Sequence, residues 1–139
     1  MKFLSFFFIL GLTVIISVSA MSDEMKDMMR SISEDCKKSE GATDVDVEKM
    51  ANEEYPDTKE GKCMIHCLQE QFGVTKEGEY QKDNVKALVE MMAGEDEDKR
   101  NASDDIAEAC KNETDPDKCE RGVMIAKCLE KEGKARGFK

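Results

Sequence analysis

The sequence has 139 residues and a formal net charge of −10, and 37% of its residues are charged. One domain is the expected number at this length. The acidic balance argues against nucleic acid or an anionic membrane as partner, because both attract clustered Lys and Arg. Aromatic residues make up only 6% of the chain and cysteines number six, so we expect a small core with covalent support.

Residues 1–20, MKFLSFFFILGLTVIISVSA, have the pattern of a secretory signal peptide. Lys2 precedes an apolar run, and Val18-Ser19-Ala20 supplies the cleavage site. The run is slightly short for a membrane span, and no basic cluster follows it, which disfavours an uncleaved anchor. We therefore expect residues 21–139 to form one secreted helical domain with no stable membrane insertion. Removal of Lys2 would take the formal charge from −10 to −11.

Apolar residues at helical spacing begin this domain. The first stripe ends before Gly41 and consists of Met25, Met28, Met29, Ile32 and Cys36. Thr43 and Asp46 resemble a capping box that opens a short helix through Ala51, and Pro56 closes that region. A third helix is predicted over residues 59–72, with Gly73 beyond its end and a common side formed by Cys63, Cys67, Leu68 and Phe72.

The second half of the domain has the same helical pattern. After a polar loop, Asp83 is predicted to cap a helix that ends at Gly94 and has the stripe Val85, Leu88, Val89 and Met92. The run EDEDKR is a linker or a solvated first turn. Residues 103–111 form a fifth helix. Asp115-Pro116 starts the last one, which carries Cys119, Val123, Met124 and Cys128. These patterns predict an all-α fold of six short helices with no sheet.

An even number of cysteines in a small secreted domain predicts three disulfides. A metal site at Cys63, His66 and Cys67 would need reduced thiolates and a fourth ligand, so we expect neither a metal nor another cofactor. A catalytic thiol is also disfavoured, because neighbouring side chains on a helix point about 100° apart. His66, the only histidine in the chain, is expected at the surface or at a rim.

Helix geometry limits which cysteines can pair. Cys63 and Cys67 lie one turn apart on one helix, which is poor disulfide geometry. Cys119 and Cys128 would be about 13 Å apart along a helix axis. Excluding these two pairs leaves ten of the 15 connectivities of six cysteines. The third and last helices must therefore each be crosslinked to other parts of the chain, and each crosslink contributes about 2–4 kcal/mol.

Methionine outnumbers leucine beyond residue 20, with nine methionines against Leu68, Leu88 and Leu129. A crosslinked helical domain can keep a cavity, and the flexible, polarizable methionine side chain suits irregular apolar ligands. The alternative is that Met25, Met28, Met92 and Met124 simply fill the core. Composition alone favours this alternative.

The cysteine spacing C-x26-C-x3-C-x42-C-x8-C-x8-C resembles that of the six-cysteine insect odorant-binding proteins, the family that includes pheromone-binding proteins. The x3 and final x8 intervals are its most specific part. The segments KCMIHCLQE and DKCERGVMIAKCLE are similar to the family's sequence around the second and third, and the fifth and sixth, cysteines. The resemblance covers the whole of residues 21–139 and the predicted signal peptide.

This resemblance implies the pairs Cys36–Cys67, Cys63–Cys119 and Cys110–Cys128, in a fold of six helices around an apolar pocket. It also implies a non-enzymatic extracellular carrier that transports small hydrophobic odorants or pheromones through sensillum lymph to olfactory receptors. We expect this carrier to be a monomer or weak dimer. The inward helix faces of such a fold predict a ligand-binding set. Its members are Met28, Ile32, Leu68, Phe72, Leu88, Met91, Met92, Val123 and Met124.

The C-terminal tail is polar, which disfavours a seventh helix buried in the pocket. Phe138 is a candidate lid residue, with a frayed terminus as the alternative. The chain has one histidine, which disfavours a pH switch driven by histidine protonation. Asn101 and Asn112 lie in N-glycosylation sequons.

Other functions fit parts of the sequence. A non-olfactory carrier in haemolymph, saliva, venom or reproductive fluid would have the same fold. A saposin-like lipid-interacting protein has a different cysteine spacing, and a small phospholipase would need a His-Asp pair or a calcium loop that we do not find. The low aromatic and high methionine content favours flexible aliphatic ligands.

Overall fold

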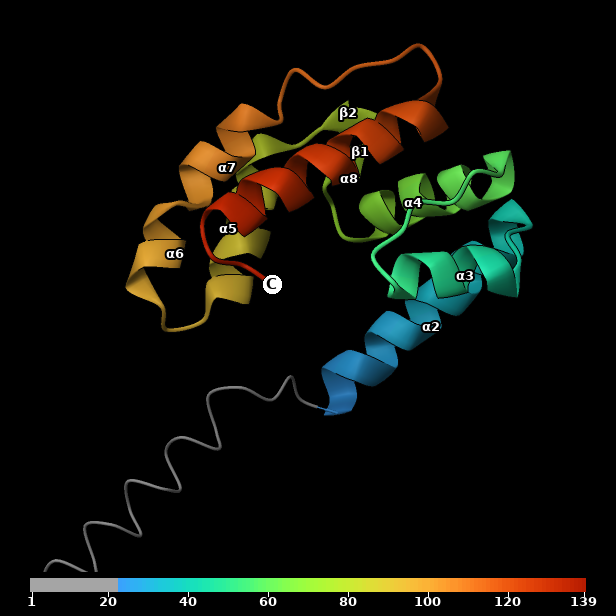
Figure 1. Cartoon of the computed structure of the whole chain (residues 1–139), viewed down its shortest axis with the longest axis horizontal. Helices are drawn as coiled ribbons and strands as arrows, with labels where there is room; N and C mark the ends of the chain where they lie inside the picture. The colour runs from blue at the N-terminus through green and yellow to red at the C-terminus, as the bar shows by residue number, and fades with distance from the viewer. Residues whose placement is uncertain (1–22) are drawn as a thin grey trace, which may run out of the picture. The chain divides into compact units, whose positions relative to one another are not determined.

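The computed structural model describes residues 23–139, so the predicted signal peptide lies outside the described residues. The chain divides into two units, Met1–Ser31 and Ile32–Lys139, and the second contains all six cysteines. The seven helices of the described residues (Figure 1) confirm the all-α prediction. They are α2 (Asp23–Glu40), α3 (Asp44–Ala51), α4 (Lys59–Gln71), α5 (Lys82–Ala93), α6 (Glu97–Asn101), α7 (Ser103–Ala109) and α8 (Lys118–Ala135).

Helix starts follow local capping chemistry. The predicted capping box is present at α3, where Thr43 and Asp46 exchange side-chain and backbone hydrogen bonds. The cap predicted for α8 is wrong: Asp117, not Asp115, accepts hydrogen bonds from the first backbone amides of α8. The Asp115 carboxylate instead accepts from the Asp117 amide and closes the turn before the helix.

Two further boundaries differ from the prediction. Helix α5 begins at Lys82, before the expected cap Asp83, and has no side-chain cap. The acidic run left open as a linker or a first turn contains helix α6, which Asp96 caps by accepting from the Lys99 amide at 3.2 Å. This extra short helix raises the number from the predicted six to seven.

A short β-hairpin lies where only a loop was predicted. Strands β1 (Thr75–Lys76) and β2 (Glu79–Tyr80) pair antiparallel around Glu77 and Gly78, both of which have positive φ. Two consecutive positive φ values match a tight hairpin turn, and glycine accepts such a value without strain. The Glu70 carboxylate of α4 accepts from the amides of Glu77 and Gly78 at 3.0 and 2.8 Å, which anchors the turn to α4.

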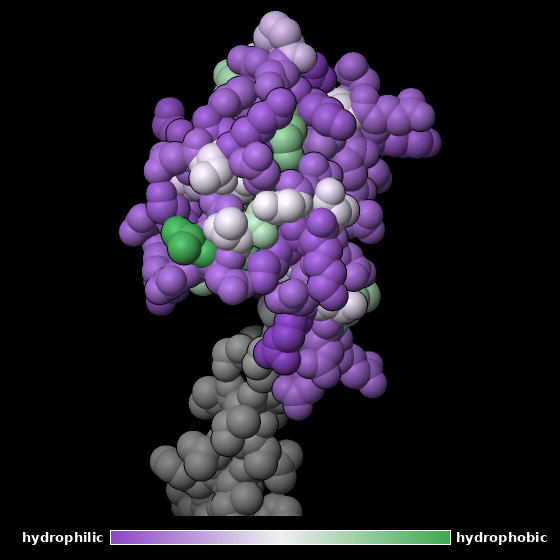
Figure 2. Space-filling view, turned by 90° about the vertical axis from the view of Figure 1, so that its right-hand side faces the viewer, coloured by the Kyte–Doolittle hydropathy of each residue, from purple (hydrophilic) through white to green (hydrophobic). Residues whose placement is uncertain are grey.

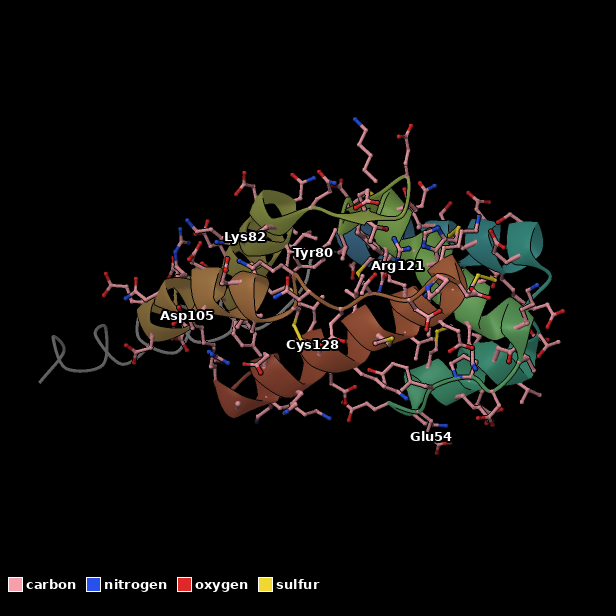
Figure 3. The ribbon with its side chains drawn as sticks, turned by 90° about the horizontal axis from the view of Figure 1, so that it is seen from above. Glu54, Tyr80, Lys82, Asp105, Arg121 and Cys128 are labelled. Carbon is pink, nitrogen blue, oxygen red and sulfur yellow. A yellow bond between two sulfur atoms is a disulfide. The ribbon has the colours of Figure 1, made fainter. Side chains whose placement is uncertain are left out.

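Three disulfides crosslink the helices, and they join the same pairs that the family resemblance implies. Cys36–Cys67 connects α2 to α4, Cys63–Cys119 connects α4 to α8, and Cys110–Cys128 connects the end of α7 to α8. Cys128 is labelled in Figure 3, where a disulfide is drawn as a yellow bond. Helix α4 is therefore crosslinked to two other helices, and α8 also carries two crosslinks.

Helices α4 and α8 lie side by side (Figures 1 and 3) and are closely packed at Gly122. A Cβ atom at this position would lie 3.3 Å from both Cα and Cβ of His66. The Gln69 side-chain amide donates to the Gly122 carbonyl at 2.7 Å. The expected surface position of His66 is therefore wrong: its side chain is buried, because α8 covers this turn of α4.

The core is a small contiguous cluster of Val74, Val85, Ala107 and Ile125. Five partly buried side chains pack against it: Phe72, Tyr80, Leu88, Val89 and Leu129. The Tyr80 hydroxyl donates to the Ala107 carbonyl at 2.8 Å. Burial, with a smaller contribution from Glu108, raises the pKa of Tyr80 to about 12.

Asp46 is a buried carboxylate, only 2% exposed, that joins two helix starts. It accepts from the Thr43 amide and hydroxyl at 2.9 Å each, and from the hydroxyl of Thr58, the N-cap of α4, at 2.7 Å. The Thr43 backbone hydrogen bond, followed by the Thr58 hydroxyl bond, holds the pKa of Asp46 below its usual 3.8. Gly61 lies against this carboxylate, where a Cβ would meet Asp46 Oδ1 at 2.7 Å.

Because its folded-state pKa is lowered, Asp46 stabilises the fold above its unfolded pKa, and this stabilisation is lost as pH falls through the folded pKa. Asp46→Asn is expected to cost about 1–2 kcal/mol of unfolding free energy at neutral pH. It should also flatten the decline in stability below about pH 4. Urea unfolding at several pH values measures both effects, and a variant whose curve stays parallel to the wild type would contradict this role.

Gly122→Ala is expected to destabilise the fold by about 1–3 kcal/mol, because the added methyl group forces α4 and α8 apart. The gain in helix propensity offsets part of this cost. Gly133→Ala, also within α8, is the matched control, since its Cβ would make only an ordinary contact of 3.6 Å with Phe138. Equal urea midpoints for Gly122→Ala and Gly133→Ala would show that the approach at Gly122 is not tight.

Candidate functional site

An apolar cavity of about 510 Å³ lies within the unit Ile32–Lys139. Three helices line it, each with four residues at i, i+3, i+4 and i+7, one face of a helix. These residues are Ile65, Leu68 and Gln69 of α4 with its C-cap Phe72, Val85, Leu88, Val89 and Met92 of α5, and Ala126, Leu129, Glu130 and Gly133 of α8. The volume is that of a pocket for a small organic molecule.

Shorter segments complete the lining. Met50 of α3, Val74 before the hairpin and Ile106 of α7 contribute apolar side chains, and Tyr55 and Phe138 contribute aromatic rings. Ile106 and Val85 are each only 2% exposed, so they belong to the core as well as to the lining. The cavity is thus continuous with the hydrophobic core of the domain.

Phe138 is placed by the backbone of the tail. Gly137 has a φ of +84°, and the Phe138 amide donates to the Gly133 carbonyl at 3.1 Å, which turns the tail back over α8. The end of the tail lies beside α8 in Figure 1. The ammonium group of Lys99 on α6 lies 5.5 Å from the centroid of the Phe138 ring. The ring therefore lies between the end of α8 and α6.

Four side chains form a polar cluster in the lining: Glu53, Tyr55, Glu130 and Lys134. The Tyr55 hydroxyl donates to the Glu130 carboxylate, which also accepts from the Lys134 ammonium group at 2.6 Å. Lys134 donates more weakly to Glu53 at 3.4 Å. The neighbouring Glu54, labelled in Figure 3 beside the end of α3, lines the cavity too.

The polar cluster shifts the acid–base behaviour of its members. Hydrogen bonds from Lys134 and then from Tyr55 lower the pKa of Glu130, and hydrogen bonds to Glu130 and Glu53 raise the pKa of Lys134. Burial, followed by the hydrogen bond to Glu130, raises the pKa of Tyr55. Glu130 and Lys134 are therefore ionised and Tyr55 is protonated at neutral pH.

The described residues hold no group of three or more His, Cys, Asp and Glu side chains arranged to bind a metal ion. All six cysteines are in disulfides. His66 does not line the cavity. Its Nε2 lies 3.7 Å from Glu70, and burial, the largest effect, lowers its pKa. What the cavity offers chemically is apolar burial with a few hydrogen-bonding groups.

Residues 18–132 match the model of the PBP/GOBP family. The chain belongs to this family. The resemblance to odorant-binding proteins, which are non-enzymatic binding proteins, is therefore confirmed. Among curated relatives, the PBP/GOBP chain is similar to general odorant-binding protein 19d from Drosophila melanogaster. The two are 28% identical over 115 residues, which cover 81% of this chain and 77% of the relative.

Solved structures show the same fold. The odorant-binding protein OBP28a from Drosophila melanogaster superposes with a TM-score of 0.72 and 25% identity, covering 84% of this chain and 98% of that one. The fatty acid binding protein OBP56a, from the oral disk of the blowfly Phormia regina, superposes with a TM-score of 0.69 and 25% identity. That match covers 84% of this chain and 97% of the blowfly chain.

Four of the residues predicted to bind ligand line the cavity of this PBP/GOBP chain: Leu68, Phe72, Leu88 and Met92. The other five do not. Met91 is 59% exposed, and Ile32 is partly buried away from the lining. Met28 belongs to the other unit, Met1–Ser31, and is 55% exposed. Val123 is buried in the core and Met124 is 37% exposed, because the part of α8 that lines the cavity begins later, at Ala126.

Several lining residues were missed by the sequence analysis. The stripe of α5 already included Val85 and Val89, and the same spacing on α4 would have added Ile65. Leu129 and Ile106 are apolar residues on predicted helices, but periodicity does not show which helix turn faces a cavity. No sequence pattern identified Glu53, Tyr55 and Lys134, because the polar cluster forms only where the loop after α3 contacts the end of α8.

Proposed function

We propose that this protein is a secreted carrier that binds one small hydrophobic molecule in the cavity and transports it through an aqueous extracellular fluid. The observation that carries the proposal is the apolar cavity of about 510 Å³, lined by one face each of α4, α5 and α8. Burial of an alkyl ligand there is worth about 25 cal/mol per Å², less the costs of binding. Micromolar dissociation constants, about −8 kcal/mol, are the expected range.

Odorants or pheromones carried to olfactory receptors are the ligands that the family and its odorant-binding relatives support best. A second candidate is a non-olfactory carrier. It is favoured by the similarity to a blowfly protein that is described as fatty acid binding and comes from the oral disk. Transcript levels in antennae and in other tissues discriminate between these two roles.

The surface supports a carrier in solution. Figure 2 shows a face covered mostly by hydrophilic residues, with scattered hydrophobic ones. Within residues 23–139, no helix has both the length and the apolar character needed to cross a membrane. We propose secretion through the predicted signal peptide at residues 1–20 and a monomer or weak dimer in the extracellular fluid. Asn101 and Asn112 are both exposed, so both sequons remain predicted glycosylation sites.

We further propose that Phe138 acts as the lid residue of the cavity, on the evidence of its place in the lining and its contacts with Gly133 and Lys99. Phe138→Ala is expected to speed release of the bound fluorescent probe N-phenylnaphthylamine about fivefold, since one apolar contact and one cation–π contact are lost. Stopped-flow displacement measures the rate. Lys131→Ala, at an exposed position of α8, is the control. Equal release rates for the two variants would show that Phe138 does not act as a lid.

The cavity itself is tested by a pair of substitutions on α5. Leu88→Trp places a large ring in the cavity, whereas Met91→Trp places the same ring on an exposed position outside the main lining. Titration with N-phenylnaphthylamine should show one site per chain. We expect Leu88→Trp to weaken binding by at least about tenfold and Met91→Trp to leave it near the wild type.

Far-UV circular dichroism and thermal unfolding establish that both tryptophan variants fold. Displacement of the probe by aliphatic alcohols, aldehydes, esters and terpenoids then ranks the ligand classes. Absence of saturable probe binding by the wild type would overturn the carrier proposal. Equal weakening by the two tryptophan variants would place the binding site outside this cavity.

A further inference from the structure

The polar groups of the cavity are rich in hydrogen-bond acceptors and poor in free donors. Three acidic residues, Glu53, Glu54 and Glu130, are among the lining residues. Two donors are engaged: the Tyr55 hydroxyl by Glu130, and the Lys134 ammonium group by Glu130 and Glu53. A third, the ammonium group of Lys139, belongs to an exposed residue of the lining. A ligand that enters the cavity therefore meets carboxylate lone pairs more readily than free N–H or O–H groups.

Gln69 adds to this imbalance. It is 7% exposed, its amide nitrogen donates to Gly122, and its side-chain oxygen has no hydrogen-bond partner among the described residues. The amide cannot reverse, because its oxygen would then face the Gly122 carbonyl oxygen. Gln69 is a lining residue and thus adds an acceptor oxygen that has no partner among the described residues.

The charges of the lining also disfavour an anionic ligand. Three carboxylates line the cavity, against the ammonium groups of Lys134 and Lys139. Lys127 lies 5.2 Å from the centroid of the Tyr55 ring, on helix α8, but it is not part of the lining. A ligand carboxylate at the polar cluster would have to take Lys134 from Glu130. It would then leave two partly desolvated anions to compete for one cation.

We propose that the polar cluster selects hydroxyl-headed aliphatic ligands over carboxylate-headed ligands of the same chain length. This inference rests on the carrier function proposed above. The hydroxyl proton binds an open lone pair of Glu130, the alkyl chain lies along the apolar stripes of α4 and α5, and the Lys134–Glu130 pair stays intact. The Tyr55 oxygen keeps a lone pair after its own donation and is a second acceptor for the same head group.

Matched ligands test the selection directly. Decanol, methyl decanoate and decanoate, each displacing N-phenylnaphthylamine from the full domain at neutral pH, differ in donor capacity and charge but share an alkyl chain. Decanol is expected to bind about fivefold more tightly than methyl decanoate, the effect of about one hydrogen bond. It should bind at least about tenfold more tightly than decanoate.

Two variants assign the selection to the polar cluster. Glu130→Gln removes the negative charge, so decanoate should gain affinity and the preference for decanol should shrink by at least about fivefold. Tyr55→Phe removes one acceptor and the donor that orients Glu130, so decanol should lose a few-fold in affinity while methyl decanoate changes little. Glu132→Gln is the matched control, because Glu132 lies on the same helix, pairs with Arg136 and does not line the cavity.

Decanoate binding as tightly as decanol to the wild type would overturn the inference and leave the carrier proposal standing. An equal change in preference for Glu132→Gln and Glu130→Gln would also overturn it, since general charge would then be the cause. If Glu130→Gln lowers thermal stability, Tyr55→Phe still tests the inference. A decanol affinity that Tyr55→Phe leaves unchanged would show that the polar cluster does not recognise the hydroxyl group. Failure of the wild type to bind the probe would refute the carrier function itself.

Discussion

The crosslinking of α4 is the constraint on which the rest of this structure depends. Two cysteines one turn apart on this helix form disulfides with other helices: Cys67 with α2 and Cys63 with α8. Gly122 then allows the backbone of α8 to approach the same part of α4. One disulfide and a missing side chain thus fix the pair of α4 and α8, in a domain with few large hydrophobic residues to bury.

The fixed pair of α4 and α8 explains how a domain with a small hydrophobic core can also contain a cavity. The first half of α8 supplies Cys119 and Gly122 to the contact with α4, and its second half, from Ala126 to Gly133, lines the cavity. Because the disulfides hold the helices together, the apolar stripes do not have to interdigitate along their whole length. The interior that they leave open is the property a carrier needs, since an apolar ligand supplies the missing contacts.

Local chemistry made much of the fold predictable from sequence. The capping box at Thr43, the stripe of α5 and the cysteine spacing each depend on residues close in the chain or on a six-point pattern. The site was less predictable because it depends on tertiary position. Periodicity placed Val123 on the last helix and predicted it to bind ligand, but only the packing of α8 decides that Val123 is core and Leu129 lines the cavity. Tyr55 and Glu130 are 75 residues apart, and no local pattern connects them.

The lining of the cavity has two parts, apolar helix faces and a few polar side chains, which differ in how sharply they can select a ligand. In the proposed carrier, the stripes of α4, α5 and α8 contribute apolar area, which distinguishes ligands mainly by size and shape. A few polar groups in an apolar lining give much sharper discrimination, because a buried donor or charge without a partner is costly. Here those groups come from the loop after α3 and from the part of α8 beyond Cys128, segments that contain no cysteine. Substitutions there can change the ligand while the crosslinked helices, and with them the cavity, stay as they are.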